Sequence, residues 1–161
     1  MLIIMTGVSG SGKTTIGRML AEKLDRQFID ADDLHSEDAV NKMKNGIALT
    51  DDDRLPWLKT IRTIISKMLD GNINAIIACS ALKKSYRQIL RGDNDNVLFV
   101  FLKGDFDLVE KRLAQRKGHF MPASLLAGQF ADLEEPADAL VLDISQTPAE
   151  IARFIIDKLE L

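Results

Sequence analysis

Residues 7–14, near the start of the chain, read GVSGSGKT and fit the pattern G-x-x-x-x-G-K-[S/T] of a phosphate-binding loop. A short apolar run at residues 2–6 precedes this loop, and residues 15–24 follow it with apolar side chains at the spacing of one helix face. A strand, a glycine-rich turn and a helix in this order direct main-chain N–H groups and the positive end of the helix at a phosphate group. The sequence therefore predicts a binding site for a nucleoside triphosphate. A glycine-rich turn without a ligand is the much weaker alternative.

The residues of this loop have distinct expected roles. Lys13 is expected to reach the β- and γ-phosphates of the nucleotide and to act in catalysis, and the Thr14 hydroxyl is expected to ligate Mg²⁺. Arg112 and Arg116 lie four residues apart, so on a helix they share a face from which they can clamp phosphates. The predicted nucleotide-binding set is Gly7, Val8, Ser9, Gly10, Ser11, Gly12, Lys13, Thr14, Thr15, Arg112 and Arg116.

Length and composition narrow the classes of protein to which the chain can belong. Its 161 residues suit a single domain, and 46% apolar and 28% charged residues are ordinary for a soluble globular protein. A net charge of -3 gives no support for a broad surface that binds nucleic acid or an anionic membrane. The sequence shows neither a membrane-spanning apolar run nor a signal peptide. The single cysteine, Cys79, cannot form an internal disulfide, which indicates a cytoplasmic protein, and it is interpreted as a buried core residue.

Strand-like and helix-like segments alternate along the whole chain. Strands are expected at residues 2–6, 27–30, 74–80, 97–102 and 139–143, with helices between them. Because these strands are short and mostly apolar, the pattern predicts an α/β fold with a parallel sheet flanked by helices on both faces. Ligands of such sheets bind at the carboxyl ends of the strands, where the polar segments of this chain should converge on one cleft.

Two helices carry apolar stripes that make specific predictions. Trp57 lies in the stripe of a helix that begins at residues 50–54, so it is expected to pack in the core rather than stack on a ligand. The last helix begins at a capping box, residues 147–150. Its side chains expected to face inward are Ile151, Phe154, Ile155 and Leu159.

The polar residues that should converge favour a small-molecule kinase. A GTPase would need an N-K-x-D motif, and the only Asn-Lys pair is followed by Met43-Lys44. Asp32, after the second predicted strand, is the candidate base or indirect Mg²⁺ ligand, although a capping carboxylate is an alternative and Asp30 and Asp33 compete for the role. The acceptor is predicted to be anionic, because three basic side chains are available to bind it: Arg54, Lys83 and Arg87.

Four segments of the chain resemble the bacterial-type gluconokinases, a family of small P-loop kinases. Besides the loop itself they are residues 28–58, with FIDADDLH and LTDDDRLPWL; residues 79–87, CSALKKSYR; and residues 116–136, with RKGHFMP, QF and LEEP. The loop is generic, whereas the other three segments are specific to this family. They occur in the family order over nearly the whole chain.

The resemblance implies a P-loop kinase fold and transfer of the γ-phosphoryl group of Mg²⁺-ATP to the 6-hydroxyl of D-gluconate by a homodimer. It places Asp32 near the acceptor and the metal, and Arg116 among the catalytic residues. It implies a single domain, residues 1–161, with a helical acceptor-binding insert at about 35–58 and a lid at about 115–135. The implied substrate-binding set is Asp32, His35, Arg54, Ser80, Lys83, Arg87 and His119, and the implied metal set is Thr14 and Asp32.

The chain departs from the family pattern mainly on the acceptor side. Ala31 stands where the family usually has glycine, Ser36 and Ala39 replace a His-Pro pair and an asparagine, and Gly128 replaces a serine or threonine. A kinase for another sugar acid or polyol is therefore the first alternative. A non-catalytic ATP-binding regulatory protein is the second. An adenylate or shikimate kinase ranks lower because it leaves the three specific segments unexplained.

Overall fold

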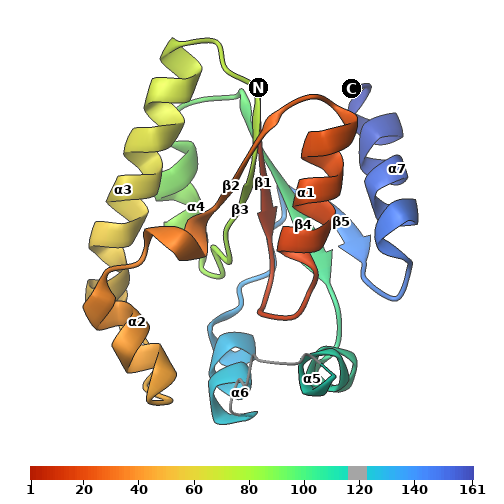
Figure 1. Ribbon diagram of the computed structural model, residues 1–161. Coiled ribbons are helices and arrows are strands. Elements are labelled where there is room, and N and C mark those ends of the chain that lie inside the picture. The colour runs from red at the N-terminus through yellow and green to blue at the C-terminus, as the bar shows by residue number, and fades with distance from the viewer. Residues whose placement is uncertain (116–122) are drawn as a thin grey trace.

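A parallel five-stranded sheet forms the centre of the protein, which the computed structural model describes over residues 1–115 and 123–161. The strands lie in the order β2-β3-β1-β4-β5, so that β1 is central and pairs with β3 and β4 (Figure 1). All four pairings between neighbouring strands are parallel, which confirms the predicted sheet and brings the strands' carboxyl ends to one edge. The strands are β1 (Leu2–Thr6), β2 (Gln27–Asp30), β3 (Ala75–Ala78), β4 (Val97–Lys103) and β5 (Leu140–Asp143).

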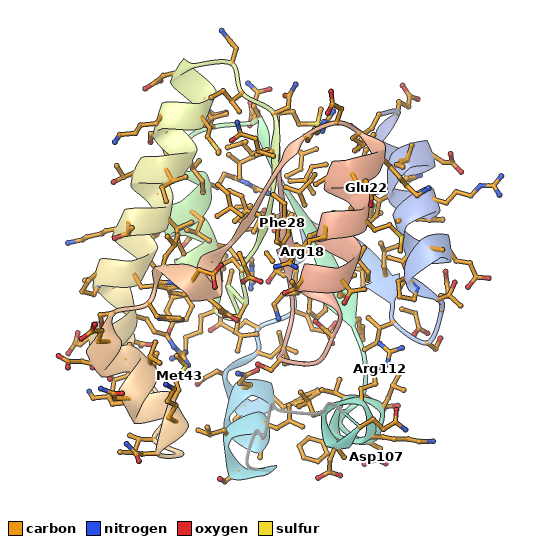
Figure 2. The ribbon with its side chains drawn as sticks, viewed as in Figure 1. Arg18, Glu22, Phe28, Met43, Asp107 and Arg112 are labelled. Atoms are coloured by element: carbon orange, nitrogen blue, oxygen red, sulfur yellow. The ribbon has the colours of Figure 1, made fainter. Side chains whose placement is uncertain are left out.

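Helices cover both faces of this sheet, with α1 and α7 on one face and α3 and α4 on the other (Figure 1). Alternate residues of β1 explain both layers: Ile3 and Met5 pack in the core beneath α1 and α7, whereas Leu2 and Ile4 pack in the core beneath α3 and α4. Figure 2 shows side chains filling both layers. The helices are α1 (Lys13–Lys23), the 3₁₀-helix η1 (Ala31–Leu34), α2 (Glu37–Lys44), α3 (Asp51–Asp70), α4 (Lys84–Arg91), α5 (Phe106–Ala114), α6 (Ala123–Asp132) and α7 (Pro148–Leu159). None of the described helices is long and apolar enough to cross a membrane.

The capping box predicted for the last helix is present, but one of its expected core residues is not buried. The Thr147 side chain accepts from the Glu150 N–H, and the Glu150 carboxylate accepts from the Thr147 N–H. Phe154, predicted to face inward, is 47% exposed. The buried face of α7, which packs against α1, carries Ile151, Ala152 and Ile155, so it is turned toward Ala152 and away from Phe154.

Trp57 is a core residue, as predicted. It lies in α3, is 5% exposed, and donates from Nε1 to the main-chain oxygen of Ala31 at 2.7 Å. Cys79 is also buried, and burial raises the pKa of its thiol to about 12, which excludes a nucleophilic role at neutral pH. Both residues belong to the core beneath α3 and α4.

The bond between Trp57 and Ala31 generates a stability prediction. Trp57→Phe keeps an aromatic ring but leaves the buried Ala31 carbonyl without its donor, so the free energy of unfolding should fall by about 1–3 kcal/mol. Urea denaturation measures this change. Phe154→Leu, a substitution of an exposed aromatic ring, is the control and should change stability by at most about 0.5 kcal/mol. Equal effects of the two variants would contradict the assignment.

Candidate active site

The phosphate-binding loop connects β1 to α1 and has the backbone that phosphate binding requires. Gly7, Gly10 and Gly12 have φ angles of 142°, 81° and 100°, which residues with a side chain rarely adopt. A Cβ atom at Gly10 would lie 2.8 Å from Leu113 Cγ, so the loop is also closely packed against α5. The Ser11 hydroxyl is buried and has no hydrogen-bond partner in the described part of the chain. The residues present thus fit a bound phosphate group.

Lys13 and Thr14, the first two residues of α1, have separate partners. Lys13 Nζ donates to the main-chain oxygens of Gly7 at 3.0 Å and Val8 at 2.9 Å, so its ammonium group lies at the loop itself. The Thr14 hydroxyl donates to Asp30 Oδ2 at 2.8 Å. This bond joins the loop to the carboxyl end of β2.

Asp30 is the carboxylate that contacts Thr14, the predicted metal ligand, whereas the sequence favoured Asp32 and left Asp30 as a competitor. It is the last residue of β2, and its Oδ1 also accepts from the Asp32 N–H at 3.2 Å. The Asp32 side chain is 71% exposed, so it is free to meet an acceptor. Among the described residues, no three His, Cys, Asp or Glu side chains form a ready metal cluster. A bound Mg²⁺ would then take its remaining oxygen ligands from phosphate and water, as is usual for this ion.

Ser80 lies at the carboxyl end of β3, beside the phosphate-binding loop. Its main-chain oxygen accepts from the Thr6 hydroxyl and from the Gly7 N–H at 3.3 Å. The next residue, Ala81, has a φ angle of 39°, an unfavourable value for alanine. Arg87 is 6% exposed and donates to the main-chain oxygens of Ala81 at 3.0 Å and Leu82 at 2.8 Å. It therefore stabilises the turn that carries Ser80, and its predicted contact with substrate stays a prediction.

Arg54 and Lys83, both predicted to bind the acceptor, lie in one closed network that we call the acceptor ring. Arg54 Nη1 lies 3.2 Å from the Tyr86 hydroxyl and 3.3 Å from Asp132 Oδ2. Lys83 Nζ lies 2.9 Å from Asp51 Oδ1 and 3.7 Å from Asp132 Oδ1. The Tyr86 hydroxyl donates to Asp51 and closes the ring. The members of the acceptor ring are Asp51, Arg54, Lys83, Tyr86 and Asp132.

Hydrogen bonds within the acceptor ring shift the pKa values of Asp51 and Lys83. The hydrogen bond from Tyr86, followed by that from Lys83, holds the pKa of Asp51 below its usual value. The bond to Asp51 raises the pKa of Lys83. The ring contains two cationic side chains, Arg54 and Lys83, and two carboxylates, Asp51 and Asp132. Sequence reasoning missed Asp51, Tyr86 and Asp132; the i, i+3 spacing of Asp51 and Arg54 was a usable signal, whereas Asp132 is 78 residues away from Arg54.

Helix α6 also contacts the phosphate-binding loop and the segment after β3. Gln129 Oε1 accepts from the Ser9 N–H at 2.7 Å, and Gln129 Nε2 donates to the Ser9 hydroxyl at 3.1 Å. Glu134, just beyond α6, accepts from the Lys84 N–H at 2.5 Å. The helix thus lies between the predicted nucleotide side and the acceptor ring.

Of the predicted basic residues 112, 116 and 119, the structure describes only Arg112, for which no contact with the phosphate-binding loop is seen. Arg112 lies in α5 (Figure 2) and donates to the main-chain oxygen of Ile144, just after β5. Arg116 and His119 lie outside the described residues, as do residues 116–122 of the predicted lid. Their roles stay predictions.

His35 is held against the core rather than in solvent. Its ring stacks on Trp57, with centroids 4.4 Å apart and planes inclined by 11°, and its side chain is 6% exposed. His35 Nε2 lies 4.0 Å from Asp32 Oδ1, while Nδ1 is buried without a hydrogen-bond partner among the described residues. Burial lowers the pKa of His35 and outweighs the opposing effect of the Asp32 carboxylate. The ring is therefore neutral at physiological pH.

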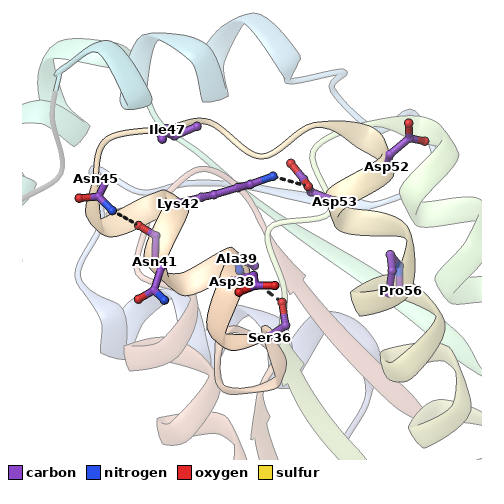
Figure 3. Close-up of a pocket in the computed structure, with 10 residues that line it drawn as sticks. All are labelled: Ser36, Asp38, Ala39, Asn41, Lys42, Asn45, Ile47, Asp52, Asp53 and Pro56. Carbon is purple, nitrogen blue, oxygen red and sulfur yellow. Dashed lines mark hydrogen bonds and ion pairs between the residues drawn. The ribbon is translucent and has the colours of Figure 1, made fainter.

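The insert itself contains a cavity of about 490 Å³ between α2 and the start of α3 (Figure 3). Lys42 pairs with Asp53 at 2.7 Å, which lowers the pKa of Asp53 to about 2. Ser36 and Ala39, two of the departures from the family pattern, line this cavity, and the Ser36 hydroxyl accepts from the Ala39 N–H. The lining residues are Ser36, Asp38, Ala39, Asn41, Lys42, Asn45, Ile47, Asp52, Asp53 and Pro56.

The other two departures have simple structural consequences. Ala31 has helical geometry in η1 and its methyl group is fully buried in the core beneath α3 and α4. Ala31 therefore does not require the positive φ angles that glycine allows, and its side chain points into the core. A Cβ atom at Gly128 would have no neighbour within 4 Å, so nothing in the described structure requires glycine there.

Comparison with known proteins identifies the family. The family model for shikimate kinase matches residues 9–160. The thermoresistant gluconokinase of Escherichia coli is 45% identical over 90% of this chain and 85% of its own. The chain belongs to the gluconokinase family of P-loop kinases. A probable gluconokinase of Mus musculus is 41% identical over 99% of this chain and 97% of its own. The family resemblance described from the sequence is confirmed.

Solved structures agree with this family. A gluconokinase from Sinorhizobium meliloti is 42% identical, with a TM-score of 0.82 over 94% of this chain and 86% of its own. A sugar kinase from Janibacter sp. HTCC2649 is 41% identical, with a TM-score of 0.91 over 99% of this chain and 94% of its own. An APS kinase from Mycobacterium tuberculosis, at 20% identity and a TM-score of 0.71, shares the fold alone. The predicted P-loop kinase fold is thereby confirmed.

The environment of His35 generates a pH prediction. Because burial lowers its pKa below the usual value near 6.5, the unfolded chain takes up this proton more readily than the folded protein as the pH falls. His35 therefore contributes stability that is present above about pH 6.5 and is lost as the pH falls below that value. The control is His35→Phe, which keeps a stacking ring without a titrating group. Denaturation at pH 8 and pH 5 measures the free energy of unfolding of both proteins. This free energy should fall more between pH 8 and pH 5 for the unsubstituted protein than for His35→Phe.

Direct titration provides the check. NMR of the ring protons should give His35 a pKa below 6.5, with His35→Phe identifying its resonance among the two histidines. A pKa at or above 6.5 would contradict the buried, neutral ring.

Proposed function

We propose that this protein is a gluconokinase, which transfers the γ-phosphoryl group of ATP to the 6-hydroxyl of D-gluconate and releases ADP and 6-phosphogluconate. The observation that carries the proposal is 45% identity to a protein named gluconokinase over 90% of this chain. The intact phosphate-binding loop and the cationic side chains of the acceptor ring support it.

The donor side is proposed to bind Mg²⁺-ATP, which supplies an electrophilic phosphoryl group whose charge the metal partly neutralises. The main-chain N–H groups of residues 7–15 bind the phosphates, and Lys13 turns from its loop carbonyls to the β- and γ-phosphates. Thr14 and Asp30 hold the metal side, with Asp32 as a further charge. Arg112, Arg116 and His119 retain their predicted places around the nucleotide and the acceptor.

The acceptor side is proposed to align the 6-hydroxyl with the phosphoryl group and to remove its proton. Asp32 is exposed and lies next to Asp30, so it is the proposed base that accepts the proton as the new O–P bond forms. Arg54 and Lys83 bind the carboxylate, and His35, Ser80 and Arg87 complete the proposed acceptor site. Closure of the insert over the acceptor would exclude water that otherwise hydrolyses ATP.

A kinase for another sugar acid or polyol is the second candidate. The supporting observation is the insert cavity, because Ser36 and Ala39 line it and replace the residues usual in the family. We also propose that the protein acts as a homodimer in the cytoplasm, as its family resemblance and single cysteine suggest.

The function is tested by release of ADP from Mg²⁺-ATP with D-gluconate beside a panel of other sugar acids and polyols. Rapid turnover on D-gluconate alone is the expected result. Turnover confined to another acceptor would retain the kinase and replace its substrate. Binding of ATP without turnover on any acceptor would support the regulatory alternative.

The separate roles proposed for Asp30, at the end of β2, and Asp32, in η1, give a second prediction. Asp30→Asn should raise the Mg²⁺ concentration needed for half-maximal rate about tenfold, because a metal-side partner is lost. Asp32→Asn should lower kcat about 100-fold with a smaller change in the KM for ATP, because a base is lost.

Lys13→Ala and Asp33→Asn are the controls for these variants. The first should abolish turnover, and the second changes an exposed neighbouring carboxylate and should leave the rate unchanged. A near-normal kcat in Asp32→Asn would remove this residue from the mechanism.

A further inference from the structure

The acceptor ring contains as many carboxylates as cations, although its cations are the groups proposed to bind an anion. Arg54 and Lys83 are both in contact with Asp132, and Lys83 also pairs with Asp51. A substrate carboxylate added to this ring would make three carboxylates for two cations. One of the protein's own carboxylates must therefore leave for the acceptor to bind with balanced charge.

We propose that Asp132 is a specificity-determining residue that, in the unliganded protein, holds the place of the acceptor's carboxylate between Arg54 and Lys83. This inference rests on the proposed function, because it assumes an anionic acceptor at the ring. The acceptor displaces Asp132 and takes over its two cations.

The bonding around the ring identifies Asp132, rather than Asp51, as the carboxylate that leaves. Asp51 is held by Lys83 at 2.9 Å and by the Tyr86 hydroxyl, whereas Asp132 lies 3.3 Å from Arg54 and 3.7 Å from Lys83. Asp51 is therefore the more firmly bound of the two.

Helix polarity strengthens the same distinction. Asp51 is the first residue of α3, where the positive end of the helix favours a carboxylate. Asp132 is the last residue of α6, where the negative end disfavours one. The Asp132 side chain is 36% exposed, so it has room to rotate into solvent without moving α6 or its Gln129 contact with Ser9.

The exchange distinguishes an anionic acceptor from a neutral one. A carboxylate replaces the charge that Asp132 withdraws, whereas the hydroxyl groups of a neutral polyol do not. Arg54 and Lys83 would lose a balanced partner if a polyol displaced Asp132. A neutral polyol therefore binds without displacing Asp132, and Asp132 weakens the binding of anionic acceptors more than that of neutral ones.

The test compares the protein with Asp132→Asn, using D-gluconate and D-glucitol, the polyol that lacks the carboxylate. Removing the competing charge should lower the KM and the calorimetric Kd for D-gluconate about fivefold, with kcat little changed. Binding of D-glucitol should improve by a smaller factor, so that the ratio of the two affinities rises. A merely structural role would not raise this ratio.

Glu135→Gln is the matched control. Glu135 lies three residues further along the chain and pairs with Lys103 outside the acceptor ring, so its loss should change neither affinity. Thermal unfolding of both variants identifies any loss of the folded state.

The outcomes separate this inference from the proposed function. Turnover of D-gluconate by the protein with an unchanged or higher KM in Asp132→Asn would overturn the inference alone. An equal gain for both ligands would also overturn it, because it would show relief of steric blocking rather than exchange of charge. Failure of the unsubstituted protein to bind or phosphorylate D-gluconate would overturn the proposed function.

Discussion

The position of β1 between β3 and β4 is the constraint on which the rest of the site depends. Both faces of β1 are buried, so this strand holds the two layers of helices together and fixes where the phosphate-binding loop begins. The Cys79 N–H donates to the Met5 oxygen at 3.0 Å, and the Ser80 oxygen accepts from the Thr6 hydroxyl and the Gly7 N–H. These bonds place the proposed nucleotide loop beside the turn that carries Ser80 and Lys83.

The proposed site has a donor side and an acceptor side, and different polar contacts hold each of them together. On the donor side, the Thr14–Asp30 bond joins the phosphate-binding loop to β2. On the acceptor side, the ring joins α3, α4 and α6 through charges that balance before any ligand binds. Helix α6 touches both sides, through Gln129 and through Asp132. An anion that enters the acceptor side must therefore exchange with a charge that the protein already holds.

Sequence reasoning recovered the features that local pattern determines. The strand at residues 27–30, the loop at 7–14 and the capping box at Thr147 were predicted because each depends on neighbouring residues. Phe154 was placed wrongly because helix periodicity does not specify which side of a stripe meets the neighbouring helix. Asp132 was missed, and Asp30 was only named as a competitor of Asp32, for another reason: their contacts are with Arg54 and Thr14, which are distant in the chain and close only after folding.

The most direct test of the account is the position of the phosphate in the product. D-gluconate is incubated with Mg²⁺-ATP and the protein, and ³¹P–¹H correlation NMR identifies the carbon that bears the phosphate. The account predicts one phosphorylated product, with the phosphate on carbon 6. Phosphate on another carbon, or only inorganic phosphate, would contradict the alignment of the 6-hydroxyl with the donor that the account requires.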